Sequence, residues 1–374
     1  MKTENKKLQK VYESDASNII GKSCKVFIPE NIEEVKKLAS ELKKIVIRGG
    51  GTGLAGGAVP QKDDNVLDLS KLIKIENPDE QRMAVIVEAG VILDDLQDFL
   101  EKRNLEFPIN PSSHSICTIG GMIATNAVGN RALKYGRTSQ WIKWIDVVDG
   151  FGNLSRKGIT EMSDYSGMEG FTGIIARACL KLTEKKTRTA TLVKADNIEE
   201  VVAIVRNMKR DESVSMIEFI DKIISKGIGL ENCCHLIIEY ENELGILKDT
   251  EYKKVLLLRD KIYPFVANQG FIRIEDPKIP IDKFEKLSAW LSQKGIPVFG
   301  HLSVGILHPC FNKEQEKYIP EMIEIVKKIG GQVSGEHGIG LLKKSFVEIN
   351  DKKIIENIKK RTDPLNKFNE GKVI

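Results

Sequence analysis

The chain has 374 residues, enough for two domains with separate hydrophobic cores. Hydrophobic residues make up 41% and charged residues 29%, as in an ordinary soluble protein, and the net charge of +4 is spread over both halves without a basic block. A nucleic-acid partner is therefore not expected. No apolar run approaches the roughly 18 residues of a membrane-spanning helix, and the N-terminus, MKTENKKLQK, is polar where a signal peptide would be apolar. We expect a cytoplasmic chain.

No two cysteines of the chain form a Cys-x-x-Cys pair; the six cysteines are at positions 24, 117, 179, 233, 234 and 310. This spacing excludes a cysteine zinc site and an iron–sulfur cluster. Any electron chemistry then requires a bound organic cofactor or a separate metal site.

The first half of the chain alternates helices and strands. Helical spacing of apolar residues and short β-branched runs are the signals used. In chain order, we expect helices at 1–20, 31–44 and 91–102, and strands at 45–47, 66–69, 85–87, 141–149 and 174–182.

The pattern changes after about residue 188 and predicts a second, smaller α+β unit. We expect helices at 198–208, 253–269 and 282–294, and strands at 216–219, 236–240 and Val298. The long helix at 253–269 is predicted despite Pro264.

The first candidate site is the stretch 45–59, IVIRGGGTGLAGGAV. Its glycines allow positive φ and let backbone N–H groups approach an anion, as in a pyrophosphate pocket, and Arg48 would add a charge. A strand follows the loop, and no Gly-Lys-Ser/Thr is present, so neither a Rossmann βαβ unit nor a Walker motif is indicated. An isolated glycine-rich surface loop is the alternative.

A second polar stretch, 110–138, is rich in Ser, Thr, Asn and Gly but also contains apolar residues to bury. A packed loop of this kind must satisfy its backbone polar groups, and a bound ligand is one way to do so.

Three of the five histidines, His301, His308 and His337, lie within 37 residues of each other, and Glu336 precedes the last. Two imidazoles and a carboxylate suit Zn²⁺ or another divalent ion with a position left for substrate. His337 would then be a free base beside the metal. A lone histidine would more often be structural.

These motifs occur in the order found in one family. RGGGTGLAGGAVP, NPSSHSICTIGGMIATNAVGNRALKYGRT, GMEGFTGIIARACLKL, GHLSVGILHP, SGEHGIGLLKK and DPLNKFNEGK together resemble FAD-linked oxidases of the vanillyl-alcohol oxidase and p-cresol methylhydroxylase type. Within that family, the chain is most similar to the group of D-lactate dehydrogenase, glycolate oxidase large subunit and D-2-hydroxyglutarate dehydrogenase. The resemblance covers roughly residues 20–374.

The resemblance implies an α+β fold with a two-part FAD-binding domain of the p-cresol methylhydroxylase type and a smaller α+β cap domain. Residues 1–187 would bind FAD, residues 188–330 would form the substrate or cap domain, and residues 331–374 would return to the FAD domain.

The resemblance also implies which residues contact FAD. The pyrophosphate would be wrapped by Arg48, Gly49, Gly50, Gly51, Thr52, Gly53 and Leu54. The flavin and ribityl chain would be lined by Pro111, Ser112, Thr118, Gly120, Gly121, Ala124, Asn126 and Gly136. The adenine side would be formed by Glu169, Gly173 and Ile175.

In the metal-dependent members of that group, the residues matching His301, His308 and Glu336 bind the metal. The residue matching His337 is the base on the substrate side, and the one matching Arg259 grips the substrate carboxylate. The chain departs from the family where Ser303-Val304-Gly305-Ile306 replaces Gly-Asp-Gly-Asn, and where Ile274 replaces a lysine. The second domain is also short.

The implied function is FAD-dependent oxidation of a small D-2-hydroxy acid, lactate- or glycolate-like, to the 2-oxo acid, with hydride transfer to flavin N5. Electrons would pass to an external acceptor, such as an iron–sulfur subunit, a quinone or an electron-transfer flavoprotein, and a homo-oligomer is left open. Two alternatives remain at this point: a flavin-binding subunit of a larger electron-transfer complex, and an FAD transferase similar to alkylglycerone-phosphate synthase.

Overall fold

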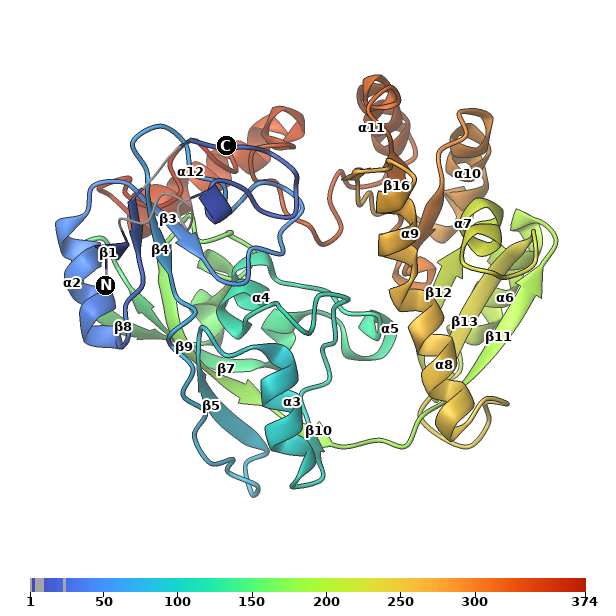
Figure 1. The fold of residues 1–374 in the computed structure, drawn as a ribbon, viewed down its shortest axis with the longest axis horizontal. Helices are drawn as coiled ribbons and strands as arrows, with labels where there is room; N and C mark the ends of the chain where they lie inside the picture. The colour runs from blue at the N-terminus through green and yellow to red at the C-terminus, as the bar shows by residue number, and fades with distance from the viewer. Residues whose placement is uncertain (1, 4–9, 23–24) are drawn as a thin grey trace. The chain divides into compact units, whose positions relative to one another are not determined.

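The computed structural model describes residues 2–3, 10–22 and 25–374 (Figure 1). The chain divides into two compact units. Unit 1 comprises Met1–Ala127, Arg137–Lys185 and His337–Ile374, and unit 2 comprises Val128–Gly136 and Lys186–Glu336. These boundaries differ from the expected ones mainly at 128–136, which pack within unit 2.

Unit 1 contains two four-stranded sheets and a two-stranded one. The first sheet has the order β1-β2-β4-β3, with β2, β4 and β3 parallel, and the second has the antiparallel order β5-β9-β7-β8. The strands of the two larger sheets are β1 (Lys2–Thr3), β2 (Lys25–Phe27), β3 (Ile45–Arg48), β4 (Asn65–Asp68), β5 (Ala84–Glu88), β7 (Ile142–Val148), β8 (Leu154–Lys157) and β9 (Ile174–Lys181). The short pair is β6 (Leu105–Glu106) and β10 (Thr183–Glu184).

Two helices of unit 1, α2 (Ile32–Glu41) and α3 (Leu93–Glu101), lie where the sequence predicts helices. Asn31 caps α2 by accepting a hydrogen bond from the Glu34 N–H at 3.0 Å. The unit also contains α4 (Ile119–Thr125) and α12 (Ile349–Thr362), which were not predicted. A single core joins Val35 of α2, Ile45 of β3, Val148 of β7 and Phe368.

The helix predicted at 1–20 is present at residues 10–11 but wrong for residues 2–3, which form β1, and for residues 12–20, which form turns and an isolated bridge; the part at 1 and 4–9 lies outside the described residues. Asp15 accepts a hydrogen bond from the Ser17 N–H at 2.9 Å, so a polar side chain there competes with helical backbone bonding.

Unit 2 is built on a six-stranded antiparallel sheet with the order β11-β13-β12-β15-β16-β14. Its strands are β11 (Thr189–Ala195), β12 (Val214–Ile220), β13 (Cys234–Tyr240), β14 (Arg273–Ile274), β15 (Val298–Gly300) and β16 (His308–Phe311). Its helices are α5 (Ala132–Tyr135), α6 (Ile198–Met208), α7 (Lys222–Gly227), α8 (Asp249–Asp260), α9 (Ile262–Asn268), α10 (Phe284–Gln293) and α11 (Ile319–Lys328).

The single helix expected at 253–269 is divided into α8 and α9 at Lys261. Pro264 then lies in the first turn of α9, where a missing N–H costs no helical hydrogen bond. The two helices pack with α7 on one face of the sheet, as Val255, Ile262, Val266 and Ile224 share one core cluster.

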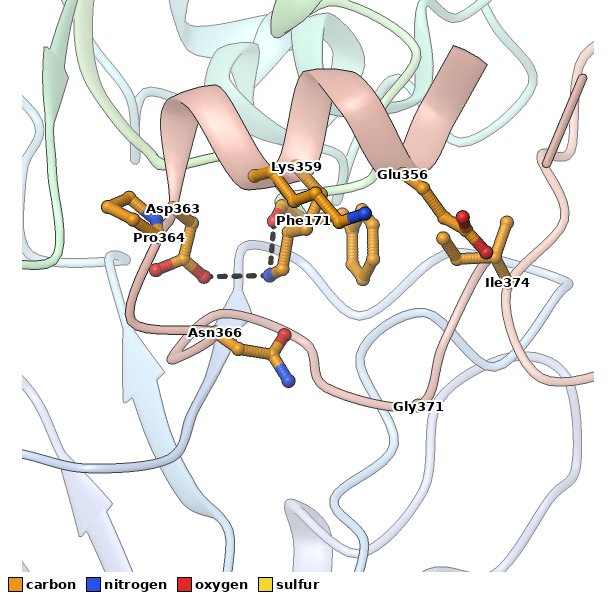
Figure 2. A pocket seen from close by; sticks show the side chains of 9 residues that line it. Phe171, Glu356, Lys359, Asp363, Pro364, Asn366, Gly371 and Ile374 are labelled. Carbon is orange, nitrogen blue, oxygen red and sulfur yellow. Dashed lines mark hydrogen bonds and ion pairs between the residues drawn. The ribbon is translucent and has the colours of Figure 1, made fainter. Parts of the chain in front are cut away.

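Residues 337–374 complete unit 1. The Ile45 N–H donates to the Lys367 carbonyl at 2.8 Å, and the Asn369 N–H donates to the Ile45 carbonyl at 2.9 Å, so this segment lies along the edge of β3. Lys359 of α12 is buried and donates to the carbonyl of Phe171 and the carboxylate of Asp363 (Figure 2). No helix in the described part of the chain is long and apolar enough to cross a membrane.

Candidate functional site

The glycine loop of unit 1 packs directly against the second polar stretch. A Cβ atom on Gly49 would lie 2.3 Å from Thr118 Oγ1, and one on Gly50 would lie 2.2 Å from the Ile116 carbonyl oxygen. At Gly53, by contrast, a Cβ atom would meet no heavy atom within 4 Å. The loop therefore has bare backbone on an open side, which fits the close approach of a pyrophosphate.

Both ends of the chain hold this loop in place. Asp15 accepts a hydrogen bond from the Ala58 N–H at 3.2 Å, and buried Lys372 donates to the Gly57 carbonyl at 2.8 Å. Burial lowers the pKa of Lys372 to about 8. Sequence reasoning identified neither residue, because each is recognisable only once the fold brings it to the loop.

Arg48 is buried beneath the loop. Its guanidinium donates to the Ser14 carbonyl at 2.7 Å and lies 5.3 Å from the centre of the Tyr12 ring. A Cβ atom on Gly51, which has a φ of 67°, would lie 2.3 Å from this guanidinium. The described contacts of Arg48 thus support the conformation of the loop.

Five of the predicted flavin-side residues lie in α4 or at its ends, namely Thr118, Gly120, Gly121, Ala124 and Asn126. Thr118 caps this helix by accepting from the Gly121 N–H at 3.2 Å, and the Gly120 N–H donates to the Ala89 carbonyl at 2.8 Å. Asn126 ends the helix with a φ of 50°. Among the other predicted residues, Pro111 and Ser112 also belong to unit 1, whereas Gly136 belongs to unit 2.

The predicted adenine-side residues are mostly packed inside unit 1. Glu169 is buried and accepts hydrogen bonds from the N–H groups of Ile339, at 2.6 Å, and Gly340, at 3.2 Å. Burial raises the pKa of Glu169. Gly173 lies just before β9, where an added Cβ atom would lie 2.8 Å from Val147, and Ile175 is buried within β9, so both residues are packed against the sheet.

A pocket of about 660 Å³ in unit 1 lies elsewhere, along α12 (Figure 2). None of its lining residues is a predicted cofactor or catalytic residue. Its lining includes Lys359 together with Phe171 and Asp363, the two residues to which Lys359 donates hydrogen bonds.

In unit 2 the fold brings His301, His308 and Glu336 together. Each residue offers one ligand atom, and these atoms all lie within 4.8 Å of one another. His308 Nε2 lies 3.3 Å from Glu336 Oε1, and His301 Nε2 lies 3.8 Å from Glu336 Oε2. Both histidines are buried. Two imidazole nitrogens and a carboxylate oxygen are a suitable donor set for a divalent metal such as Zn²⁺.

The loop between the two histidines keeps Gly305 of the family's Asp-Gly-Asn residues but has Val304 and Ile306 in place of the Asp and the Asn. Val304 and Ile306 pack in an apolar cluster with Val128 and Ala132. Gly305 has a φ of 77°, and its carbonyl accepts from the Ile279 N–H at 2.8 Å. Apolar packing and backbone hydrogen bonds therefore shape this loop.

The approach of Glu336 is set by Asp276, a fully buried residue. Asp276 Oδ2 accepts from the Glu336 N–H at 2.6 Å, the Gly335 N–H at 3.0 Å and the Ser334 hydroxyl at 2.9 Å. Three donors on one carboxylate oxygen restrict the backbone that carries Glu336.

A second buried carboxylate, Glu218 of β12, contacts the cluster from the sheet. Glu218 Oε2 lies 2.6 Å from His301 Nδ1, and Glu218 Oε1 lies 3.8 Å from Arg259 Nε. Burial alone would raise the pKa of Glu218, but the adjacent His301 and Arg259 lower it overall. The same carboxylate raises the pKa of His301 against the opposing effect of burial.

Arg259 is thus connected to the cluster through Glu218, from its position near the end of α8. His337 follows Glu336 directly in the chain and is the first residue of the last segment of unit 1. The replaced lysine position, Ile274, is buried in the apolar core of unit 2. Neighbouring Arg273 donates to Glu275 at 2.6 Å.

The sequence analysis missed Glu218 and Asp276. For Glu218 a signal was present, since a charged residue in the mostly apolar strand VSMIEFI is unusual without a partner. Asp276 lies outside regular secondary structure, and its role depends on residues 334–336, which are distant in sequence.

Comparisons with known proteins support the same cofactor. Residues 25–157 match the family described as FAD binding domain, and residues 247–373 match the family described as FAD linked oxidases, C-terminal domain. A D-lactate dehydrogenase of Archaeoglobus fulgidus is 30% identical, over 92% of this chain and 90% of the relative. The glycolate oxidase subunit GlcD of Bacillus subtilis is 27% identical, over 93% of this chain and 88% of the relative.

Two further proteins are similar at lower sequence identity. A D-2-hydroxyglutarate dehydrogenase of Stutzerimonas stutzeri is 23% identical, over 93% of this chain and 90% of the relative. A solved structure of an alkyldihydroxyacetonephosphate synthase superposes with a TM-score of 0.69 at 16% identity, over 99% of this chain and 82% of that one. The latter shows the fold alone. Since a relative of 30% identity matches nearly the full length and both domain families are present, the chain belongs to the FAD-linked oxidases and is a member of an FAD-dependent oxidoreductase family.

Proposed function

We propose that this protein oxidises a small D-2-hydroxy acid to the 2-oxo acid and passes the electrons to an external acceptor. The observation that carries the proposal is the cluster of the buried His301 and His308 with Glu336, whose ligand atoms lie within 4.8 Å of one another in a chain of an FAD-dependent family. The names of the relatives, D-lactate dehydrogenase, glycolate oxidase subunit and D-2-hydroxyglutarate dehydrogenase, support this substrate class.

FAD supplies the hydride acceptor in such a reaction, and a divalent metal supplies a Lewis acid for the substrate oxygens. His301 and His308 would hold the metal through Nε2, and Glu336 through its carboxylate. Arg259 would bind the substrate carboxylate, since a planar guanidinium can engage more than one carboxylate through its several N–H groups. His337 would accept the proton of the substrate hydroxyl.

The cofactor side of the proposal uses the open backbone around Gly53 and the loop at 110–126. The acceptor of the electrons would be a separate molecule, because Cys-x-x-Cys spacing is absent from the sequence. The subunit name of the Bacillus subtilis relative supports a partner protein in this role.

The test is anaerobic reduction of the bound flavin by D-lactate, glycolate or D-2-hydroxyglutarate. The loss of the flavin's visible absorbance measures the reduction. We expect at least one of these acids to reduce the wild-type protein. We expect His337→Ala to retain the metal and to lose about 10²–10⁴-fold in the rate of reduction, as for the loss of a general base. His301→Ala should lose both metal and reduction.

Metal analysis of the same three proteins provides the control. Equal metal content in wild type and His301→Ala would exclude the cluster as the metal site. Failure of all three acids to reduce a flavin that dithionite reduces normally would argue for a flavin-binding subunit or a non-redox transferase instead.

A further inference from the structure

One face of the sheet in unit 2 carries two buried glutamates, Glu218 on β12 and Glu239 on β13. Both are fully buried, and both lie on the face that packs against α7, α8 and α9, because Met216 and Ile220, two residues either side of Glu218, belong to the apolar core on that face. Burying a carboxylate costs folding free energy unless the carboxylate is paired, so each of these glutamates needs specific partners.

Helix α8 contacts both glutamates with residues seven positions apart. Tyr252 donates to Glu239 Oε2 at 2.6 Å, and Arg259 lies 3.8 Å from Glu218. Seven positions correspond to two helical turns, so both residues point from the same side of α8. The two glutamates are therefore comparable in burial and in packing.

Their other partners differ. Glu239 binds Arg131 and Ser215, which connect parts of unit 2. Glu218 instead binds His301 Nδ1 at 2.6 Å, and this contact leaves His301 Nε2 directed to the carboxylate of Glu336 at 3.8 Å. An imidazole held at Nδ1 has its ring orientation and its ligand nitrogen determined in advance.

We propose that Glu218 is a positioning residue, which accepts a hydrogen bond from His301 Nδ1 and thereby holds His301 Nε2 in place as a metal ligand. This inference rests on the proposed function for the metal but concerns a residue outside the ligand set. Outer carboxylates of this kind typically change metal affinity about 10–100-fold.

The test compares Glu218→Gln with Glu239→Gln, which removes an equally buried charge from the neighbouring strand. Titration of metal-free protein with Co²⁺ or Zn²⁺, in competition with a chelator, should show affinity about 10–100-fold weaker in Glu218→Gln. Glu239→Gln should bind metal as the wild type does. Circular dichroism tests whether each variant is folded. If Glu218→Gln does not fold, Glu218→Asp replaces it in the test, because this variant keeps the charge but has a shorter side chain. Glu218→Asp should bind metal less tightly than the wild type.

A second readout does not depend on metal. The chain has only five histidines, so selective ¹⁵N-histidine labelling gives few signals, and His301→Ala identifies that of His301. In metal-free wild type and in Glu239→Gln, the Nδ1 proton of His301 should resonate at low field in its hydrogen bond to a carboxylate. In Glu218→Gln, this proton should move upfield because the acceptor is neutral.

The outcomes separate the two proposals. Equal metal affinity in wild type and Glu218→Gln, or an unchanged His301 Nδ1 signal, would overturn the role of Glu218 and leave the proposed oxidation intact. If the wild type binds no metal while the Nδ1 signal shifts as expected, the positioning of His301 is supported and the metal is removed from the proposed function.

Discussion

At the scale of single residues, the glycines of the loop after β3 do different things. Gly49 and Gly50 allow the loop to contact residues 116–118, whereas Gly53 has open space at the position of a Cβ atom. A glycine pattern in a sequence cannot separate these roles, because each depends on what the rest of the fold places opposite the backbone.

This difference predicts that two alanine substitutions affect different properties, FAD binding in one case and stability in the other. Gly53→Ala should change the stability of flavin-free protein by less than about 1 kcal/mol, yet weaken FAD binding at least tenfold, or about 1.4 kcal/mol. Gly50→Ala should destabilise unit 1 with and without FAD, because its Cβ would lie 2.2 Å from a backbone oxygen. Thermal unfolding and fluorescence titration with FAD measure the two effects. Normal FAD affinity in Gly53→Ala would show that the open side of the loop does not bind the cofactor.

At the scale of elements, the short segment 128–136 belongs to unit 2 although unit 1 residues flank it in sequence. Arg131 forms a two-bonded ion pair with Glu239, at 2.7 and 3.2 Å, and Tyr135 contacts Glu241 at 2.5 Å. Burial would raise the pKa of Glu239, but the opposing effect of its charged partners, chiefly Arg131, lowers this pKa to about 2. This pair holds the segment on the sheet.

Arg131→Met should therefore destabilise unit 2. Breaking a buried ion pair from one side costs about 3–5 kcal/mol, and we expect the lower end because Arg188 still lies 3.8 Å from Glu239. Chemical denaturation of Arg131→Met, Glu239→Gln and the double variant measures this effect. The double variant should lose less than the sum of the single losses, and additive losses would show that the pair is not coupled.

At the scale of the whole molecule, unit 1 is assembled from three separated segments, and Lys372 near the C-terminus bonds to the glycine loop near residue 57. The pKa of Lys372 falls from 10.5 to about 8 because the ammonium group is buried. Between these values the unfolded chain binds more protons than the folded chain. The free energy of unfolding therefore rises with pH in this window, and the contribution is lost as pH falls through about 8.

Lys372→Met should remove this rise, which amounts to at most roughly 3 kcal/mol at about 1.36 kcal/mol per pH unit. The measurement is the free energy of unfolding at saturating FAD from pH 7 to about 10.5. Lys37→Met, at an exposed lysine of α2, is the control and should keep the wild-type slope. If the free energy of unfolding rises equally with pH in the wild type and in Lys372→Met, the buried ammonium group of Lys372 is not the cause of the rise.

The sequence by itself predicted the α+β fold class, the family and the FAD cofactor. These depend on the order of local motifs and on two loops whose glycine and polar content is higher than an ordinary loop requires. It also singled out His301, His308 and Glu336, and whether they bind metal stays a prediction. Tertiary structure alone decided that 128–136 pack in unit 2, that residues 12–20 form turns, and that 253–269 divide into two helices. It also brought Glu218, Asp276 and Lys372 to their partners, at separations of 83, 60 and 315 residues. The physical reason is that local periodicity encodes which residues are buried, whereas the partner of a buried charge is set by strand order and loop packing, which no local pattern contains.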